Sequence, residues 1–146
     1  MKQMKWAIVG TGYIANEFAK GMQVVEDAVL AAFAQKYDCE KVYTDFNTML
    51  EQADIDVVYI AVPNDCHYSY IMSALEKGIP VLSEKPMVDN QWQLNNVLNK
   101  AEEKKVFLME GMWTRCFPAV MEARNWISKG KIGKPLAVLS SFDIKP

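Results

Sequence analysis

Trp6-Ala7-Ile8-Val9-Gly10-Thr11-Gly12-Tyr13-Ile14-Ala15 is the stretch around which the rest of the sequence is organised. An apolar run breaks into a glycine turn and then into a helical pattern, in which the small and apolar residues follow the i, i+3, i+4, i+7 spacing: Ala15, Phe18, Ala19 and Met22. The glycine spacing is G-x-G-x-x-A, a variant of the dinucleotide-binding fingerprint. The stretch therefore predicts a strand over 5–9, a phosphate-binding turn and a helix.

Each small residue of this fingerprint has its own expected task. Gly10 permits the tight turn, Gly12 lets the backbone approach a pyrophosphate, and Ala15 lets the helix pack closely on the strand. The helix N-terminus supplies N–H groups and the positive end of a dipole for the phosphates. Glycine turns between strand and helix also occur for structural reasons alone. The rest of the sequence is therefore needed to distinguish a phosphate-binding turn from a purely structural one.

Composition excludes several classes of protein. A chain of 146 residues, half of them apolar, fits one domain with a proper core. A formal charge of −2 offers no basic face for nucleic acid. No apolar run reaches membrane-spanning length and the start lacks a secretory pattern, so we expect a soluble, cytoplasmic protein without a membrane partner. The spacing of Cys39, Cys66 and Cys116 suggests neither disulfides nor a metal site.

Strand-like and helix-like segments alternate along the chain, which predicts an α/β fold with a doubly wound parallel sheet. Strands are expected over 28–34, 41–43, 57–62, 80–83 and 106–109. Helices are expected around three sets of apolar positions: Phe46, Met49 and Leu50, with Thr44 or Asp45 as cap; Tyr68, Ile71, Met72 and Leu75, closed by Gly78; and Leu94, Val97, Leu98 and Ala101.

The tail breaks this rhythm. We expect a helix over 118–128, a turn over 130–135 and a strand over 136–144, whose two alternating faces could begin a different sheet. The sequence thus predicts a dinucleotide-binding domain over 1–117 and the start of a second domain over 118–146.

One connection is too short. A parallel strand pair needs a crossover of a dozen or more residues, yet residues 35–40 leave room for barely two helical turns between the second and third expected strands. Either this crossover is abnormally short, or residues of the natural protein are absent near Ala32 and Phe33; we favour absence.

Four motifs in this order resemble the glucose-fructose oxidoreductase/inositol dehydrogenase (Gfo/Idh/MocA) family: Gly10-Thr11-Gly12-Tyr13-Ile14-Ala15, Val62-Pro63-Asn64-Asp65-Cys66-His67, Glu84-Lys85-Pro86 and Met109-Glu110-Gly111-Met112-Trp113-Thr114-Arg115. The last motif is most similar to the dihydrodiol and xylose dehydrogenase branch. The resemblance implies a Rossmann NAD(P)-binding domain followed by a second α/β domain, nearly all of it missing here, that often mediates homodimerisation.

The resemblance also implies an activity and a set of contacts. The activity is NAD(P)-dependent hydride transfer to or from a small molecule: a sugar, polyol or trans-dihydrodiol. The implied cofactor contacts are Gly10, Thr11, Gly12, Tyr13, Ile14, Pro63, Asn64, His67, Glu84, Lys85, Trp113 and Arg115, and no metal is implied.

The choice between NAD and NADP depends on a residue about 20 positions beyond the glycines, acidic for NAD and basic for NADP. Asp27 lies before the second strand, at its wrong end, and Lys36 follows that strand next to the suspect junction. The branch resemblance favours NADP.

Lys85 is the candidate catalytic residue, because it follows the carboxyl end of a central strand, where doubly wound sheets bind ligands. Its ammonium group can polarise a substrate oxygen and stabilise alkoxide character during hydride transfer. The plain alternative is a surface lysine beside a turn proline. Glu84 either pairs with Lys85 or caps the cofactor site.

The other candidates each have two readings. His67, the only histidine, is an acid/base or, as we favour, shapes the cofactor side of the pocket. Asn64 contacts the cofactor or serves a local turn. Trp113 either lines the nicotinamide pocket or is a core aromatic residue. Arg115 either binds a substrate oxygen or a cofactor phosphate, or it makes an interdomain ion pair. Tyr13, Tyr59, Tyr68 and Tyr70 are read as packing or pocket-edge residues.

Two other functions stay open. The chain could be a dinucleotide-binding module that is catalytically silent because it lacks its substrate domain, and with it the tyrosine or histidine that commonly serves the family as second acid/base group. More weakly, the intact protein could use its nicotinamide for redox-assisted glycoside cleavage.

Overall fold

The computed structural model describes residues 3–26, 28–32 and 41–141. The chain forms two compact units, Met1–Gly111 and Met112–Pro146. The division falls ahead of the boundary expected after residue 117, so the residues Met112–Phe117 belong with the tail.

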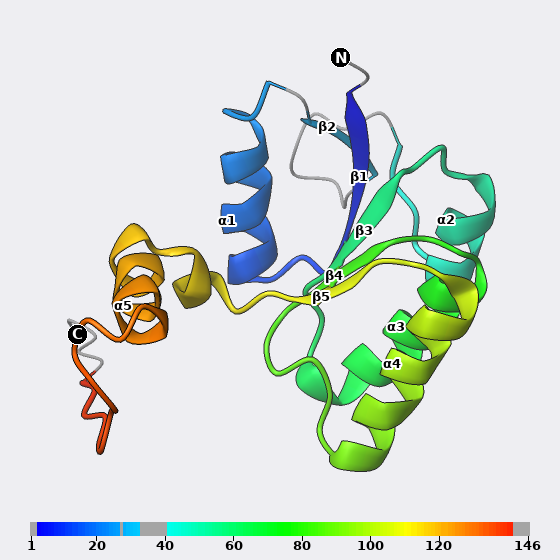
Figure 1. Ribbon diagram of the computed structural model, residues 1–146. Helices are drawn as coiled ribbons and strands as arrows, with labels where there is room; N and C mark the ends of the chain where they lie inside the picture. The colour runs from blue at the N-terminus through cyan, green and yellow to red at the C-terminus, as the bar shows by residue number, and fades with distance from the viewer. Residues whose placement is uncertain (1–2, 27, 33–40, 142–146) are drawn as a thin grey trace. The chain divides into compact units, whose positions relative to one another are not determined.

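The first unit is built on one parallel sheet, shown in Figure 1, with the strand order β2-β1-β3-β4-β5. Along the chain its elements are β1 (Met4–Val9), α1 (Tyr13–Met22), β2 (Ala28–Ala32), α2 (Phe46–Gln52), β3 (Val57–Ile60), α3 (Asn64–Glu76), β4 (Val81–Ser83), α4 (Gln91–Lys104) and β5 (Leu108–Glu110). Because all pairs are parallel, every strand ends at the same edge of the sheet. The predicted doubly wound α/β fold is confirmed.

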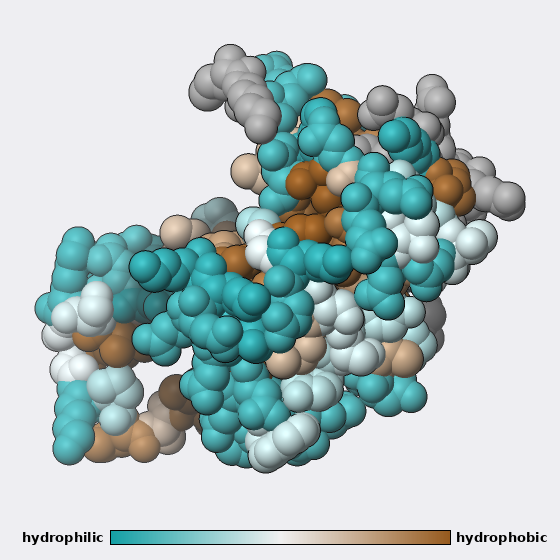
Figure 2. Space-filling model, turned by 90° about the vertical axis from the view of Figure 1, so that its right-hand side faces the viewer, coloured by the Kyte–Doolittle hydropathy of each residue, from teal (hydrophilic) through white to brown (hydrophobic). Residues whose placement is uncertain are grey.

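Two apolar layers cover the sheet. Figure 1 shows α1 on one face and α2, α3 and α4 on the other. The strands feed both layers by alternation: Ala7 and Val58 pack towards α2, α3 and α4, while Ile8 and Tyr59 pack with Ala15 and Ala19 of α1. Val57, Val58, Tyr59 and Ile60 are all buried, as expected for a strand covered on both faces. The face that carries α2, α3 and α4 is mainly hydrophilic outside (Figure 2).

The order of the strands fixes where a ligand would bind. From β1 the chain moves outward to β2, and it then returns past β1 to β3 and continues to β4 and β5. The winding reverses between β1 and β3, and open α/β sheets bind ligands at the carboxyl edge of this switch point. The turn after β1 and the loop after β3 lie there.

Helix starts follow the capping signals of the sequence. The Asp45 side chain accepts from the Thr48 N–H at 2.8 Å and caps α2, as one of the two expected candidates. Hydrogen bonds from the Thr48 hydroxyl and N–H lower the pKa of Asp45. Asn90 caps α4 in the same way by accepting from Gln93 N–H.

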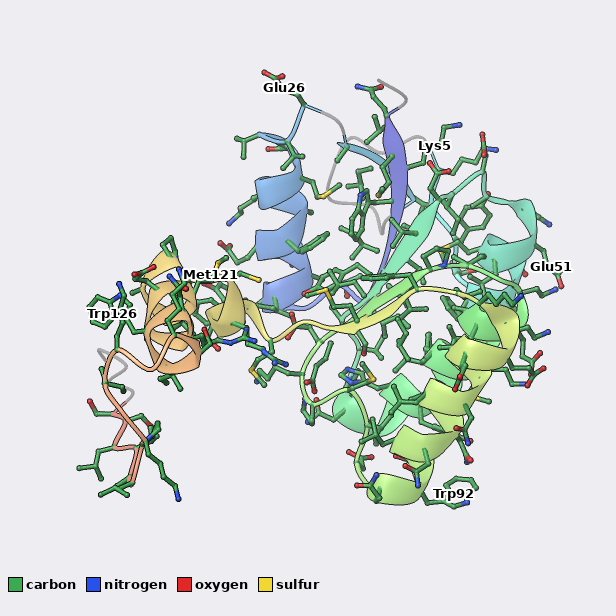
Figure 3. All side chains as sticks on the ribbon, in the orientation of Figure 1. Lys5, Glu26, Glu51, Trp92, Met121 and Trp126 are labelled. Carbon is green, nitrogen blue, oxygen red and sulfur yellow. The ribbon has the colours of Figure 1, made fainter. Side chains whose placement is uncertain are left out.

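Ion pairs lie at the amino end of the sheet and between α2 and α3, far from the switch point. Lys5, labelled in Figure 3, pairs with Asp54, and its N–H donates to Asp56 at 2.9 Å. Glu51, also labelled, pairs with Lys77 across α2 and α3. Such exposed pairs contribute little stability each, so the two apolar layers hold the unit together.

Three expectations for this unit need correction. Residues 41–43 form no strand; only Lys41 makes an isolated bridge, because so short a run has no continuous ladder with a neighbouring strand. The last strand starts at Leu108 instead of residue 106, and Val106 still belongs to the helix end, where its N–H donates to Ala101. Leu98 is exposed and does not join the apolar stripe of α4.

The second unit contains η1 (Trp113–Cys116) and α5 (Pro118–Ser128), followed by turns over residues 129–132. The expected helix over 118–128 is confirmed. The expected strand over 136–144 is wrong for residues 136–141, which have no regular structure; residues 142–144 lie outside the described part. A strand needs a neighbour for its backbone groups, and the described residues of this unit include no strand.

Several expectations fall on residues outside the described ranges: Asp27, the end of the second strand at 33–34, Lys36, Cys39 and the suspect junction at Phe33. In the described ranges, no helix is both long and apolar enough to cross a membrane.

Candidate functional site

The glycine turn, residues Gly10–Gly12, leaves the carboxyl end of β1 and lies against the end of β3. Gly10 has φ +110°, a conformation that L side chains rarely adopt, and a Cβ there would come within 2.2 Å of the Ala61 carbonyl oxygen. The adjacent N–H of Ala61 donates to Val9 at 2.8 Å. Gly10 is therefore required by the fold itself.

Gly12 has no such structural requirement. It is the N-cap of α1 with φ −72° and ψ 179°, which any residue adopts, and a Cβ there would have no atom within 4 Å. Neither backbone conformation nor packing explains a glycine at this place. Close approach of a ligand to the backbone does explain it, which is the task that the fingerprint gives to its second glycine. Ala15, fully buried against Ile8 and Tyr59, fulfils the third task.

The start of α1 is open to an anion. No side chain caps Gly12, and the first turn of α1 has no acidic residue. Tyr13 and Ile14 are exposed, as is Thr11. The Asn16 side-chain amide donates to the Thr11 and Gly12 carbonyl oxygens at 3.0 and 2.7 Å. These bonds engage the carbonyl groups of the turn, whereas the first N–H groups of the helix have no side-chain acceptor at the cap.

A cavity of about 250 Å³ adjoins the glycine turn on the face of α2 and α3. Its walls come from the end of β1, the start of α2, and α3: Ile8, Val9, Gly10, Thr11, Tyr43, Thr44, Asp45, Phe46, Met49, Val62 and Tyr70. Phe46 and Tyr70 contact each other with ring centroids 4.7 Å apart. Apolar and aromatic walls beside a phosphate-binding turn suit a flat heteroaromatic ring.

The loop after β3 brings Pro63 and Asn64 to the same edge. Pro63 is the N-cap of α3 and Asn64 its first residue, and both are exposed. His67, one turn further, is fully buried, with Nδ1 2.7 Å from the Pro86 carbonyl oxygen and Nε2 3.0 Å from that of Val62. His67 thus connects the loop after β3 with the loop after β4, and its expected part in shaping the cofactor side of the pocket stays a prediction.

The lysine loop, residues Glu84–Met87, leaves the carboxyl end of β4. One Glu84 carboxylate oxygen accepts from the Tyr59 hydroxyl at 2.6 Å, and the other accepts from the Lys85 backbone N–H at 3.2 Å. Glu84 therefore serves the backbone and a buried tyrosine instead of pairing with the Lys85 ammonium group. Burial and the Glu84 carboxylate together raise the pKa of Tyr59. The Lys85–Pro86 peptide bond is cis.

Lys85 itself is exposed at this edge. Within the described residues, its ammonium group has no hydrogen bond or ion pair, although both neighbours in the chain are tied down. A cation without a partner beside a ligand edge is able to donate to a substrate oxygen, and this is the arrangement that electrostatic catalysis needs.

The end of β5 closes the lysine loop. A Glu110 carboxylate oxygen accepts from the Met87 N–H at 2.9 Å, and the Gly111 N–H donates to Ser83 at 2.6 Å. A Cβ on Gly111 would lie 3.1 Å from the Ser83 oxygen and 3.3 Å from Glu84 Oε1. Glu110 and Gly111 thus serve the loop after the neighbouring strand.

Trp113 and Arg115 belong to η1 of the second unit. Trp113 is half exposed and contacts Phe117 edge-on, with ring centroids 5.1 Å apart. The Arg115 N–H donates to the Met112 carbonyl oxygen at 3.0 Å. Their assignment to a cofactor or substrate stays a prediction.

Within the described ranges, no group of three His, Cys, Asp or Glu side chains is arranged to bind a metal ion. Cys66 and Cys116 are free thiols, and burial, then Asp65, raises the pKa of Cys66.

Three residues of the site were not identified from the sequence: Asn16, Tyr59 as a hydrogen-bond donor, and Glu110. A signal existed for Tyr59, because a hydroxyl group in the middle of a doubly buried strand needs a buried acceptor. A signal for Glu110 was weaker: a carboxylate at the end of a strand is more often solvated.

Comparisons with known proteins agree with this geometry. Residues 4–112 match the sequence model of the oxidoreductase family with NAD-binding Rossmann fold, GFO_IDH_MocA. The chain is 31% identical to the trans-1,2-dihydrobenzene-1,2-diol dehydrogenase of Xenopus laevis, over 94% of this chain and 46% of that protein. It is also 31% identical to the D-xylose 1-dehydrogenase (NADP(+)) of Hypocrea jecorina, over 97% of this chain and 42% of that protein.

A solved structure is similar as well. The scyllo-inositol dehydrogenase of Lactobacillus casei, determined with NAD(H) and scyllo-inositol, superposes with a TM-score of 0.83 at 28% identity, over 90% of this chain and 43% of that one. The chain spans less than half the length of these relatives.

Proposed function

The chain belongs to the Gfo/Idh/MocA oxidoreductase family, and on that premise we propose that the carboxyl edge of its sheet binds a nicotinamide dinucleotide for hydride transfer. Because the chain spans less than half of its relatives, turnover is proposed for a polypeptide of the relatives' length. The substrate class is a sugar, polyol or trans-dihydrodiol, by analogy with the dihydrodiol, xylose and inositol dehydrogenases.

The observation that carries this proposal is the contrast between Gly10 and Gly12. Gly10 is demanded by the backbone, whereas Gly12 is a glycine with free space where a side chain would stand. The residues present therefore fit a pyrophosphate: the backbone at Gly12 and the open start of α1 would hold it. The aromatic cavity at Phe46 and Tyr70 would take the adenine ring.

The chemistry of the bound cofactor is hydride exchange at its nicotinamide ring. The chain's own residues would hold the cofactor and polarise the substrate oxygen. Pro63 and Asn64 would bound the cofactor site at the end of β3, and the Lys85 ammonium group would donate to the substrate oxygen as alkoxide character develops. No described residue of the first unit is assigned as the second acid/base group, since His67 is buried between two carbonyl groups.

The proposed cofactor is NADP. The support is that the similar xylose dehydrogenase is NADP(+)-dependent by name, while the similar inositol dehydrogenase holds NAD(H). The described lining of the cavity has one carboxylate, Asp45, and no cation, so a 2′-phosphate would need a basic partner elsewhere. Parallel titrations with NADPH and NADH decide between the two.

Cofactor titration followed by nicotinamide fluorescence tests the binding half of the proposal. Gly12→Val fits the backbone at that residue but fills the space needed by a pyrophosphate, so its Kd for NADPH should rise by more than about tenfold, or 1.4 kcal/mol. An unchanged Kd in this variant would refute the assignment of the glycine turn.

Turnover by a polypeptide of the relatives' length, measured on a panel of sugars, polyols and trans-dihydrodiols, tests the catalytic half. Lys85→Ala should lower kcat by about a hundredfold to a thousandfold, the loss typical of one electrostatic donor, with nearly the same Kd for NADPH. Loss of cofactor affinity with the same kcat would count against this role.

A catalytically silent binding module is the second candidate, because the described residues supply a dinucleotide site at the glycine turn but no assigned second acid/base group. The intact mass of the natural polypeptide separates the two: a mass near 16.6 kDa supports the silent module, and about twice that value supports the enzyme.

A further inference from the structure

We propose that His67 and Glu110 are positioning residues that hold the lysine loop against the loop after β3, and that they thereby fix where Lys85 meets a bound cofactor. The inference rests on the proposed function, because it concerns how the same site is held together. Neither residue needs to contact the cofactor or the substrate for this role.

His67 is the only described side chain that bridges these two loops through both ends of its ring. Nδ1 lies 2.7 Å from the carbonyl oxygen of Pro86, directly after Lys85, and Nε2 lies 3.0 Å from that of Val62, directly before Pro63. Because a carbonyl oxygen only accepts, a ring with two N–H groups makes both bonds, and a neutral ring makes one at a time. The ring is fully buried, so water does not replace it.

The other anchors of the lysine loop come from different elements. The Glu110 carboxylate of β5 accepts from the Met87 N–H at 2.9 Å, and the Tyr59 hydroxyl of β3 donates to Glu84 at 2.6 Å. The loop is thus fixed on both sides of Lys85, from β3, α3 and β5, whereas the Lys85 side chain stays exposed.

A positioning role differs from a general structural role in what its loss would change. β3 and β4 keep their own ladder, in which Val58, Tyr59 and Ile60 pair with Val81, Leu82 and Ser83. Loss of the His67 ring should therefore leave the sheet and the glycine turn in place and release the segment that carries Lys85. Since near-ångström precision is needed between reacting groups, a loosened loop reduces contact without abolishing cofactor binding.

The experiment measures how well NADPH shields Lys85 from an amine-acetylating reagent, with the modified lysines quantified by peptide mass spectrometry. NADPH is supplied at ten times the Kd of each variant, so that occupancy is equal and a fully shielded amine reacts about tenfold more slowly. Lys105, which is exposed before β5 at the opposite end of that strand, serves as the internal control.

In the unmodified chain we expect about tenfold protection of Lys85 and none of Lys105. In His67→Leu and in Glu110→Leu, protection of Lys85 should fall below about twofold at the same occupancy. Glu110→Gln should restore it, because the amide oxygen still accepts from the Met87 N–H.

Undiminished protection of Lys85 in a folded, NADPH-binding His67→Leu variant would overturn the inference and leave the proposed function intact. If His67→Leu does not fold, the Glu110 pair decides, and equal protection in Glu110→Leu and Glu110→Gln would overturn it. Binding of NADPH without protection of Lys85 in the unmodified chain contradicts the inference and the catalytic role of Lys85 together. Absence of binding of both NADPH and NADH to that chain contradicts the proposed function itself, and if NADH alone binds, the same protection is measured with NADH.

Discussion

The glycine turn and the lysine loop lie on the same edge of one sheet, yet they are held in different ways. The glycine turn is shaped by its own backbone: Gly10 fits against Ala61, and Asn16, four residues beyond Gly12, holds the turn's carbonyl groups. The lysine loop is held by side chains from distant parts of the chain: Tyr59, His67 and Glu110. The first is a local structure and the second a tertiary one.

This difference separates what a sequence motif can show from what it cannot. A local turn carries its requirements within a few consecutive residues, so that spacing alone identifies it. A loop held by remote side chains shows only its own residues, and its supports are found once the strands bring them together.

The largest effect on stability should come from Gly10, with Gly12 of the same turn as its control. Gly10→Ala forces a Cβ within 2.2 Å of the Ala61 oxygen at φ +110°, and should destabilise the chain by about 3 kcal/mol, from backbone strain and overpacking together. Gly12→Ala should change the unfolding free energy by less than about 0.5 kcal/mol, because its Cβ has free space. Urea unfolding measures both.

Similar losses of unfolding free energy in the two variants would contradict the difference between the two glycines, since Gly12 would then be structural as well. A stable Gly12→Ala variant with weakened NADPH binding would support a role of Gly12 in ligand approach.

The next effect concerns the anchors of the lysine loop. Tyr59→Phe removes the donor to the Glu84 carboxylate and should cost about 1.5–3 kcal/mol, the range for hydrogen bonds to charged groups. Tyr68→Phe is the matched control: it removes an accepted hydrogen bond from the Asn96 amide, 3.2 Å long, between α3 and α4, and should cost about 0.5–1.5 kcal/mol. Thermal or urea unfolding of the pair gives the difference; equal costs would show that the Glu84 bond has no special strength.

A smaller effect should appear with pH. Burial raises the pKa of Tyr59 above its ordinary 10.0, so the folded state keeps this proton at a pH where the unfolded chain loses it. The contribution is complete below pH 10 and declines above it, by at most about 1.4 kcal/mol per pH unit. The unfolding free energy of the unmodified chain should therefore fall more steeply between pH 10 and 11.5 than that of Tyr59→Phe; parallel slopes would contradict the buried contact.

Much of the fold could be predicted from the sequence because the signals are local. Val57–Ile60 is apolar throughout and is buried on both faces, Asp45 caps the helix that it precedes, and the helix over 118–128 has the expected bounds. The expectations failed where a strand depends on a partner, over 41–43 and 136–141. Pairing is a property of two segments, and one segment does not reveal it.

The candidate site divides in the same way. Gly10, Gly12 and Lys85 lie at the carboxyl edge as expected, because their positions follow from the ends of strands. The sequence left open whether Glu84 pairs with Lys85, and whether His67 is an acid/base or shapes the cofactor side of the pocket. Glu84 instead accepts from Tyr59, and His67 turns inward between Val62 and Pro86, because buried polar groups take the partners that tertiary packing supplies.

NMR chemical shifts of the backbone amides, followed during titration with NADPH, test most directly whether the glycine turn binds the pyrophosphate of a nicotinamide dinucleotide. At 16.6 kDa the chain suits such a measurement. We expect saturable shifts that are largest at residues 10–14, with further shifts at Val62 and Asn64 on either side of Pro63, and small ones at Lys105. Saturable binding that leaves the amides of residues 10–14 unshifted would contradict this expectation.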